Sequence, residues 1–308
     1  MSQFASTVPF SRLQSLWKFS RPHTIIGTSL SVLALYILSV AGIENFPLSR
    51  YVWQALLAWI ACLCGNIYIV GLNQLEDIAI DKINKPDLPL ASGRFSVNTG
   101  RAIVLVTGIL ACILSLFGGL WLFGTVSLSL AIGTAYSLPP VRLKRFPLPA
   151  ALCILTVRGV VVNLGLFLHF RTVMGENGAI TPPVWLLTLF ILLFTIAIAI
   201  FKDVPDTEGD RTYRITTFTL LLGKSKILRI VLLTISLCYA LMIGAGLARL
   251  PGMNPPVLVV GHLALLLLLW WRARGVNLEE TTEITDFYQF IWKLFFLEYI
   301  LFPLACLP

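Results

Sequence analysis

The stretch NQLEDIAIDKINKP, residues 73–86, directly follows an apolar run that begins near Trp53. If the helix of that run continues, Asn73, Asp77 and Asp81 recur every four residues and lie on one face, about 6 Å apart along the axis. Carboxylates stacked in this way repel each other, so a stabilising structural role explains them poorly. Oxygen ligands in this arrangement indicate a site for Mg²⁺ together with phosphate oxygens.

A second acidic stretch, KDVPDTEGDR at residues 202–211, ends another long apolar run. The spacing of Asp206 and Asp210 repeats that of the first stretch. Pro205 removes a backbone donor and Gly209 favours a turn, so this copy is predicted to be part helix and part loop. Two acidic clusters at the ends of two membrane helices predict one shared site.

The composition is that of a membrane protein, because 57% of the 308 residues are hydrophobic and only 12% are charged. Apolar runs long enough to cross a bilayer fall at about 24–43, 53–73, 102–119, 121–138, 149–169, 184–201, 227–248, 256–271 and 287–306. We therefore predict an all-α polytopic membrane protein with about nine transmembrane helices. Residues 1–23 are expected to form a cytoplasmic lead, and residues 24–308 a single transmembrane domain.

Lys and Arg residues are distributed unevenly between the two ends of these helices. Eighteen of the 23 fall on the side of the N-terminus, three fall on the other side (Arg50, Arg171 and Arg249), and Arg158 and Lys293 lie within spans. The positive-inside rule predicts that the N-terminus and both acidic clusters are cytoplasmic. The net charge of +8 therefore orients the protein and does not indicate nucleic-acid binding. The lead lacks the apolar segment of a signal peptide and is too short and mixed for an organelle transit peptide, which favours a bacterial inner or intracellular membrane.

The two acidic stretches follow the second and the sixth predicted helices, which are four spans apart. An even number of spans keeps both copies in the same orientation. We expect two pseudo-repeated four-helix halves plus a ninth helix around a central cavity.

Basic residues surround the acidic clusters in the cytoplasmic loops. The candidates for binding a diphosphate are Lys82, Arg94, Arg142, Lys144 and Lys202. A basic loop after a helix is also what the positive-inside rule alone predicts. The prediction that these cations bind a diphosphate therefore rests on the nearby acidic clusters. The apolar bundle below would accept a hydrocarbon chain, and an aromatic face such as that of Tyr136 would stabilise an allylic cation. The sequence thus predicts a site for a lipid diphosphate.

Arg158 and Asn163 fall near the middle of the fifth predicted helix, and both are candidates for binding substrate. An ionisable side chain at that depth is costly and marks a functional site by default, and pairing of Arg158 with Glu298 or an Asp is the structural alternative.

The paired motifs Asn73-x3-Asp77-x3-Asp81 and Asp206-x3-Asp210 resemble those of the UbiA superfamily of intramembrane aromatic prenyltransferases, over nearly the whole chain. The flanking sequences narrow the resemblance to the homogentisate phytyltransferase branch. They are NQLxDxxxDKINKPxLPLASG at 73–93, YSxPPxRLKR at 136–145, RGxxxNxG at 158–165 and KDxPDxEGDR at 202–211.

That resemblance implies Mg²⁺-dependent transfer of a phytyl chain from phytyl diphosphate to homogentisate. The acceptor would lose its carboxyl carbon and give 2-methyl-6-phytylbenzoquinol, on the route to tocopherol (vitamin E), in a cyanobacterial thylakoid or plasma membrane. The resemblance places Mg²⁺ and the diphosphate on Asn73, Asp77, Asp81, Asp206 and Asp210.

Other roles rest on the same resemblance and on charge. Asp203 is a further candidate catalytic carboxylate, and Arg158 is the hypothesis for the homogentisate carboxylate. The base for the acceptor phenol stays open between a carboxylate such as Asp203 and a water molecule.

Several alternatives remain at this stage. Geranylgeranyl or solanesyl diphosphate is an alternative donor, and the acceptor of a chlorophyll synthase or a hydroxybenzoate or naphthoate prenyltransferase is an alternative acceptor. A secondary transporter is the alternative from a different class of protein function. It is disfavoured because the acidic residues lie at helix ends on one side and not near the bilayer midplane.

Overall fold

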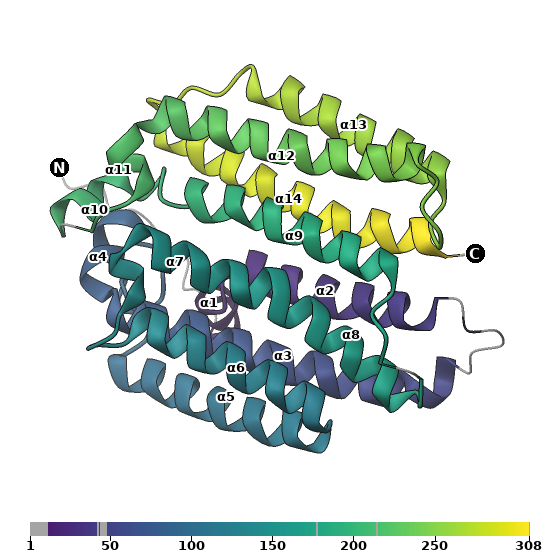
Figure 1. The fold of residues 1–308 in the computed structure, drawn as a ribbon. Helices are drawn as coiled ribbons and strands as arrows, with labels where there is room; N and C mark the ends of the chain where they lie inside the picture. Colours follow the sequence, from purple (N-terminus) through teal and green to yellow (C-terminus); the bar gives the residue numbers. More distant parts are fainter. Residues whose placement is uncertain (1–11, 42, 44–47, 177, 214, 308) are drawn as a thin grey trace, which may run out of the picture.

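The computed structural model describes residues 12–41, 43, 48–176, 178–213 and 215–307. Within these ranges every regular element is helical, and nine helical spans are long and apolar enough to cross a membrane. The prediction of nine transmembrane helices is therefore confirmed, and the chain is an integral membrane protein (Figure 1).

The nine spans are formed by the long helices of the chain. Their bounds are α2 (Pro22–Val40), α3 (Leu48–Glu76), α5 (Val97–Phe117), α6 (Leu120–Ser137), the continuous span of α7 (Pro147–Ile154), π-helix η2 (Leu155–Val161) and α8 (Val162–Val173), then α9 (Pro182–Phe201), α12 (Lys224–Leu247), α13 (Pro255–Ala273) and α14 (Thr281–Cys306). The shorter elements lie between them or before them. They are α1 (Arg12–Phe19), α4 (Ile78–Asn84), 3-10 helix η1 (Leu143–Arg145), α10 (Thr207–Thr212) and α11 (Phe218–Leu222).

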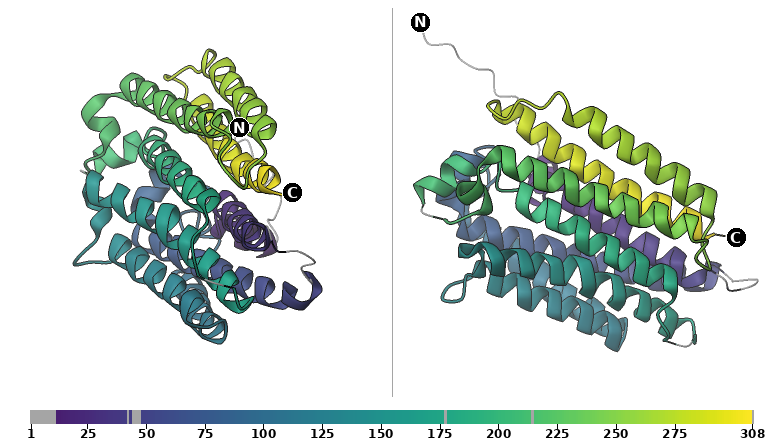
Figure 2. Two further views of the ribbon diagram at one scale, coloured as in Figure 1. Left: turned by 45° about the vertical axis from the view of Figure 1, so that its right-hand side comes forward. Right: turned by 45° about the horizontal axis from the view of Figure 1, so that its top comes forward.

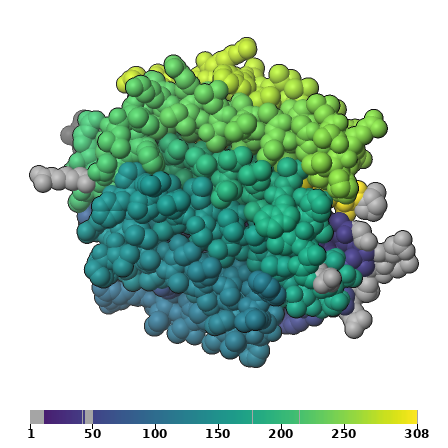
Figure 3. Space-filling view, viewed as in Figure 1, coloured from purple at the N-terminus to yellow at the C-terminus, as the bar shows by residue number. Residues whose placement is uncertain are grey.

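The long helices run side by side and form an inner and an outer set (Figures 1 and 2). Helices α2, α3, α6, α9 and α14 and the span α7–η2–α8 supply the walls of an internal cavity. Helix α5 packs outside α3 and α6, while α12 and α13 pack outside α9 and α14. The face shown in Figure 3 is covered by helices α5 to α9, with α12 above them. The outer set therefore separates much of the inner set from lipid.

Local sequence explains where several spans begin. Proline stands in the first turn of α2, α7, α9 and α13, where its missing N–H has no helical partner to lose. Helices α5 and α6 are separated at Gly118 and Gly119, and Gly119 adopts φ +97°, a conformation that favours glycine. The chain can therefore reverse direction between these two spans without a longer loop.

The first acidic stretch is not one continuous helix. Helix α3 ends at Glu76, and Asp77 adopts φ −113° and ψ 15° before α4 begins at Ile78. The expectation of a single uninterrupted face through Asn73, Asp77 and Asp81 is therefore wrong. Asp is a residue that favours the start of a helix over its interior, and its carboxylate here is held by cations from another segment.

The second acidic stretch has the predicted mixture of helix and turn. Helix α9 ends at Phe201, and Asp206, at φ −91° and ψ 4°, directly precedes α10. Asp77 and Asp206 thus hold equivalent places, each before a short helix whose fourth residue is a second aspartate. The two stretches are alike locally, while the division of the whole chain into two four-helix halves stays a prediction.

The N-terminal lead is described only in part. Helix α1 covers residues 12–19, and Phe19 is fully buried against Leu72, Leu90 and Val104. Residues 1–11 of the predicted lead lie outside the described residues. The described part is therefore packed against α3 and α5.

Candidate active site

The two acidic stretches meet where α4 packs against α10. The backbone N–H of Gly209 donates to Oδ1 of Asn84 at 2.9 Å, and Lys85 forms an ion pair with Asp206. A Cβ atom on Gly209 would collide with Asn84, so the close approach needs a glycine at this position. Segments about 125 residues apart in the chain therefore form one polar surface at the same end of the bundle.

Asp77 is the most heavily engaged carboxylate of the first stretch. Its Oδ2 accepts from Nζ of Lys144 at 2.6 Å and from Nδ2 of Asn73 at 3.0 Å, and its Oδ1 accepts from Arg142 at 3.2 Å. Arg21 in turn donates to Oδ1 of Asn73 at 3.2 Å. The loop after α6 therefore supplies the cations that hold the end of α3.

Asp81 and Asp210 have the opposite environment, with little compensation for their charge. Asp81 is 4% exposed, and its Oδ2 is buried without a hydrogen-bond partner among the described residues. Burial raises the pKa of the Asp81 carboxyl to about 6. Burial, followed by repulsion from Asp203 and Asp206, raises the pKa of Asp210 to about 7. A cation bound nearby would stabilise the ionised form of both carboxylates.

Asp203 and Lys202 form an ion pair at the end of α9, with Nζ and Oδ1 2.8 Å apart. The same Nζ lies 3.4 Å from the hydroxyl oxygen of Tyr136 on α6. Lys202 and Tyr136 both line the cavity, whereas Asp203 does not. The ion pair therefore holds Lys202 at the mouth of the cavity.

The described residues contain no group of three His, Cys, Asp or Glu side chains placed to enclose a metal ion. Mg²⁺ at a phosphate site is commonly bound by one or two carboxylates, with phosphate oxygens and water completing its shell. The unpartnered Oδ2 of Asp81 fits this kind of ligand. The donor set thus suits an ion that is shared with a bound diphosphate, and it does not form a preformed protein cage.

Beneath this polar surface lies a cavity of about 280 Å³. Arg21, Asn73, Tyr136 and Lys202 line its mouth, and apolar or small side chains line its interior, including Val32, Cys62, Gly65, Val126 and Leu166. Asn73 and Cys62 are 11 residues apart on α3, so the cavity extends about 16 Å along that helix. A polar mouth above a long apolar interior suits an amphiphile with an anionic head.

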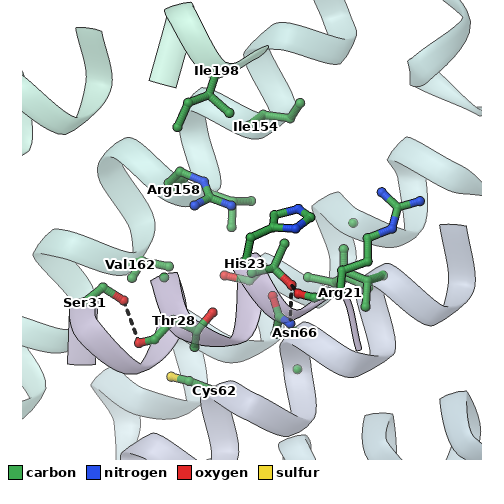
Figure 4. Close-up of a pocket in the computed structure, with 18 of the residues that line it drawn as sticks. Arg21, His23, Thr28, Ser31, Cys62, Asn66, Ile154, Arg158, Val162 and Ile198 are labelled. Carbon is green, nitrogen blue, oxygen red and sulfur yellow. Dashed lines mark hydrogen bonds between the residues drawn. The ribbon is translucent and has the colours of Figure 1, made fainter. Parts of the chain in front are cut away.

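Arg158 reaches into the cavity from the π-helix η2 (Figure 4). Its guanidinium carbon lies 4.6 Å from the ring centroid of Trp292 and 5.3 Å from that of Phe295. No carboxylate of the described chain pairs with it, and its Nε is buried without a partner. The alternative of a pair with Glu298 is wrong, because Glu298 contacts His262 with Nε2 and Oε2 3.1 Å apart.

Asn163 lies behind the cavity wall. It is fully buried, donates to the backbone oxygen of Gly159 at 2.9 Å and of Arg158 at 3.3 Å, and accepts from the hydroxyl of Tyr299 at 2.9 Å. These bonds join η2 to α14. The geometry gives Asn163 a role in positioning Arg158, and the expected direct contact with substrate stays a prediction.

Arg142, Lys144 and Lys202 contact aspartates of the acidic stretches, and Lys82 and Arg94 are the two remaining candidate cations. Lys82 is exposed on α4, and Arg94 donates to Ser92 at 2.9 Å and to the backbone oxygen of Asp87 within its own loop. Neither side chain lines the cavity. Their contact with a diphosphate stays a prediction.

Four residues of this region were not recognised as candidates from the sequence: Arg21, His23, Lys85 and Trp292. Arg21 and His23 flank the proline that starts the first span, and Lys85 ends the first acidic stretch. For these three residues, a position beside a motif or a helix start could have identified them as candidates from the sequence. Nothing in the local sequence distinguishes Trp292 from the other aromatic residues of the last span.

Comparison with known proteins relates this geometry to one family. The model of the UbiA prenyltransferase family matches residues 29–294. Homogentisate phytyltransferase from Synechocystis sp. is 58% identical over 294 residues, covering 95% of this chain and 96% of that protein. Homogentisate phytyltransferase 1 of Arabidopsis thaliana is 45% identical and covers 94% of this chain and 75% of that protein.

A solved structure shares the fold. The structure of a UbiA homolog from Archaeoglobus fulgidus bound to GPP and Mg²⁺ superposes with a TM-score of 0.63, at 16% identity, over 93% of this chain and 98% of that one. At this identity the likeness extends to the fold alone.

Proposed function

The chain belongs to the UbiA prenyltransferase family, and on that premise we propose that it transfers a phytyl chain from phytyl diphosphate to homogentisate. The reaction would release diphosphate and CO₂ and give 2-methyl-6-phytylbenzoquinol. The observation that carries the proposal is the joining of two acidic stretches over the mouth of one apolar cavity. The 58% identity to the Synechocystis homogentisate phytyltransferase supports this choice of donor and acceptor.

The diphosphate would bind at the polar surface formed by α4, α10 and the loop after α6. Asn73, Asp77, Asp81, Asp206 and Asp210 would hold Mg²⁺ there in common with the phosphate oxygens. Mg²⁺ supplies positive charge that stabilises diphosphate as a leaving group. Basic groups that now hold the carboxylates would turn to the phosphates, namely Lys85, Arg142, Lys144 and Lys202.

The hydrocarbon chain would extend from this mouth into the apolar interior of the cavity. The carbon–oxygen bond that breaks would then lie near Tyr136, which lines the mouth. An aromatic face stabilises a neighbouring cation, so the ring of Tyr136 would lower the energy of positive charge on the allylic carbon. Asp203 would act through Lys202, which it holds in place at 2.8 Å.

The acceptor would bind deeper, at Arg158. A buried guanidinium with no carboxylate partner among the described residues is suited to the carboxylate of an aromatic acid. Homogentisate offers that group, whereas a neutral acceptor would leave the cation uncompensated. This is the reason to favour an acidic acceptor at this site.

The orientation proposed for the protein follows its loop charges. The N-terminus and both acidic stretches would face the cytoplasm of a bacterial, specifically cyanobacterial, cell, in a thylakoid or plasma membrane.

Product analysis tests the proposed function. The purified protein would be given Mg²⁺, radiolabelled homogentisate, and phytyl, geranylgeranyl or solanesyl diphosphate in separate reactions. We expect a decarboxylated prenylquinol that forms fastest from phytyl diphosphate, disappears on chelation and returns with Mg²⁺. Faster product formation from geranylgeranyl or solanesyl diphosphate would change the donor. Product only with a hydroxybenzoate, naphthoate or chlorophyllide acceptor would overturn the assignment of homogentisate.

A further inference from the structure

We propose that His23 accepts the proton of the acceptor's ring hydroxyl during prenyl transfer, across the cavity from Arg158. The inference rests on the proposed function, since it assigns a role toward the same aromatic acceptor.

His23 and Arg158 reach into one space from different helices. His23 stands in the first turn of α2 and Arg158 on η2, and both line the cavity (Figure 4). The imidazole centroid lies 4.8 Å from the ring of Trp292, and the guanidinium carbon of Arg158 lies 4.6 Å from the same ring. Both side chains pack on the same buried ring, so an aromatic acid whose carboxylate binds Arg158 would have its own ring within reach of His23.

The other groups on the cavity wall are poorly suited to accept a proton. No carboxylate of the described residues lines the cavity, and Lys202 is held by Asp203. The hydroxyl of Tyr299 already donates to Asn163. Arg21 and Arg158 are permanent cations. By contrast, neither imidazole nitrogen of His23 has a hydrogen-bond partner among the described residues, and its ring contacts Tyr288 and Trp292. Burial and the neighbouring cations Arg21, Arg158 and Lys85 oppose its protonation, and the negative charges of the bound diphosphate and acceptor carboxylate would offset these cations.

Asp203, the carboxylate that the sequence suggested as the base, is less suited to accept this proton. It is bound by Lys202 at 2.8 Å and lies outside the cavity lining. Accepting a proton from the acceptor would require breaking that ion pair. His23 can do so without losing a contact that the structure describes.

The chemistry balances as follows. His23 takes the hydroxyl proton, and the electron pair left on oxygen makes the adjacent ring carbon more nucleophilic. That carbon bonds to the first carbon of the prenyl chain as the carbon–oxygen bond to diphosphate breaks, with the electron pair leaving on diphosphate. The ring carbon then gives up its hydrogen as a proton, and His23 returns its own proton to the oxygen. Loss of CO₂ leaves an electron pair on the methylene carbon, which takes one proton, so no net proton is needed.

The test compares His23→Asn with the unchanged protein on two acceptors, homogentisate and a ring-fluorinated homogentisate whose hydroxyl is more acidic. With homogentisate we expect kcat to fall about 100-fold, since positioned bases commonly contribute this much or more. With the fluorinated acceptor the loss should shrink about tenfold, because a more acidic hydroxyl depends less on a base. Phytyl diphosphate should bind the variant with unchanged Kd, which also shows that the variant is folded.

Two controls separate this inference from simpler explanations. His169→Asn makes the same change on a histidine outside this cavity and should leave the ratio of the two acceptor rates unchanged. His23→Gln is assessed by the same criteria if His23→Asn fails to bind donor. An equal loss with both acceptors, or no loss, would overturn the role of His23. If the unchanged protein itself forms no product from homogentisate, the proposed function is wrong. The role of His23 toward this acceptor is then overturned as well.

Discussion

Asp77 has three partners, Lys144, Arg142 and Asn73, whereas Asp81 buries a carboxylate oxygen that has none among the described residues. The two aspartates of one motif therefore differ in what they do for the fold. Asp77 neutralises a lysine whose side chain is only 8% exposed. Asp81 adds a poorly compensated charge, which is typical of a residue kept for a ligand.

This difference predicts opposite effects on stability from the same substitution. Asp77→Asn leaves Lys144 without its charged partner and should destabilise the protein by about 3 kcal/mol, whereas Asp81→Asn should leave stability unchanged or raise it. Both variants should lose prenyl transfer, because both carboxylates are assigned to the Mg²⁺–diphosphate site. Thermal unfolding in detergent and product formation measure the two effects. A similar melting temperature for both variants would contradict the distinction.

Arg158 is the second residue whose role can be tested, because kinetics distinguish an effect on acceptor binding from an effect on donor binding. Arg158→Gln should raise KM for homogentisate by about 10- to 100-fold, since a hydrogen bond to a charged group contributes roughly 1.5–3 kcal/mol. The Kd for phytyl diphosphate should stay unchanged, because the donor head is assigned to the two acidic stretches and their cations and not to Arg158. Arg101→Gln, at an exposed arginine on α5, serves as the matched control. An unchanged KM in a folded Arg158→Gln protein would remove the residue from the acceptor site.

At the scale of elements, the site depends on the junction of two short helices. Helices α4 and α10 each begin just after an aspartate, and Gly209 lets them approach through its bond to Asn84. The membrane helices α3 and α9 carry these segments to the same end of the bundle. The distance between the two acidic stretches is thus set by backbone packing at one glycine.

Gly209→Ala should therefore reduce activity without changing any charged residue. The added methyl would collide with Asn84 and separate α4 from α10, at a cost of about 1–3 kcal/mol. Gly244→Ala on α12, where a Cβ meets nothing within 4 Å, is the control. Adding Asn84→Ala to Gly209→Ala should recover part of the loss by making room for the methyl. Full activity of Gly209→Ala alone would show that the junction does not set the site.

The π-helix η2 is the other element with a functional position. A π-turn within a helix shifts the direction of the side chains that follow it, and such turns are frequent at functional sites. Here it carries Arg158, and Asn163 and Tyr299 hold its backbone to α14. The fifth span thus presents a cation to the cavity from a wall fixed by buried hydrogen bonds.

At the scale of the whole bundle, six of the spans that the structure describes enclose the cavity and three stand outside them. The cations at and around its mouth come from the residue before α2, the loop after α4, the loop after α6 and the end of α9. Its interior is mostly apolar, with Arg158 and Asn66 among the polar exceptions, and it follows the long axis of the bundle. We therefore expect the head and the chain of the donor to be recognised by different parts of the protein.

Filling the interior should change the preferred length of the donor. Cys62→Phe places a large side chain in the cavity below the mouth and should lower kcat/KM for phytyl diphosphate by about tenfold. Geranyl diphosphate should be affected less, because its shorter chain ends nearer the mouth. Cys64→Phe, on the same helix but outside the cavity lining, controls for the added bulk. Equal losses with both donors would place the chain somewhere other than this cavity.

The sequence alone determined the number of spans, because bilayer thickness fixes how long an apolar run must be, and it determined the two acidic motifs, because carboxylates are rare at such places. It also indicated Arg158 by its depth. Only the tertiary structure decided that α3 ends before Asp77, that Lys85 pairs with Asp206, that Asn163 lies behind the wall and that His23 faces Arg158. The physical reason is that lipid is as apolar as the protein interior, so the hydrophobic pattern of a membrane helix does not mark its inward face. Those contacts are set by packing between segments far apart in the chain.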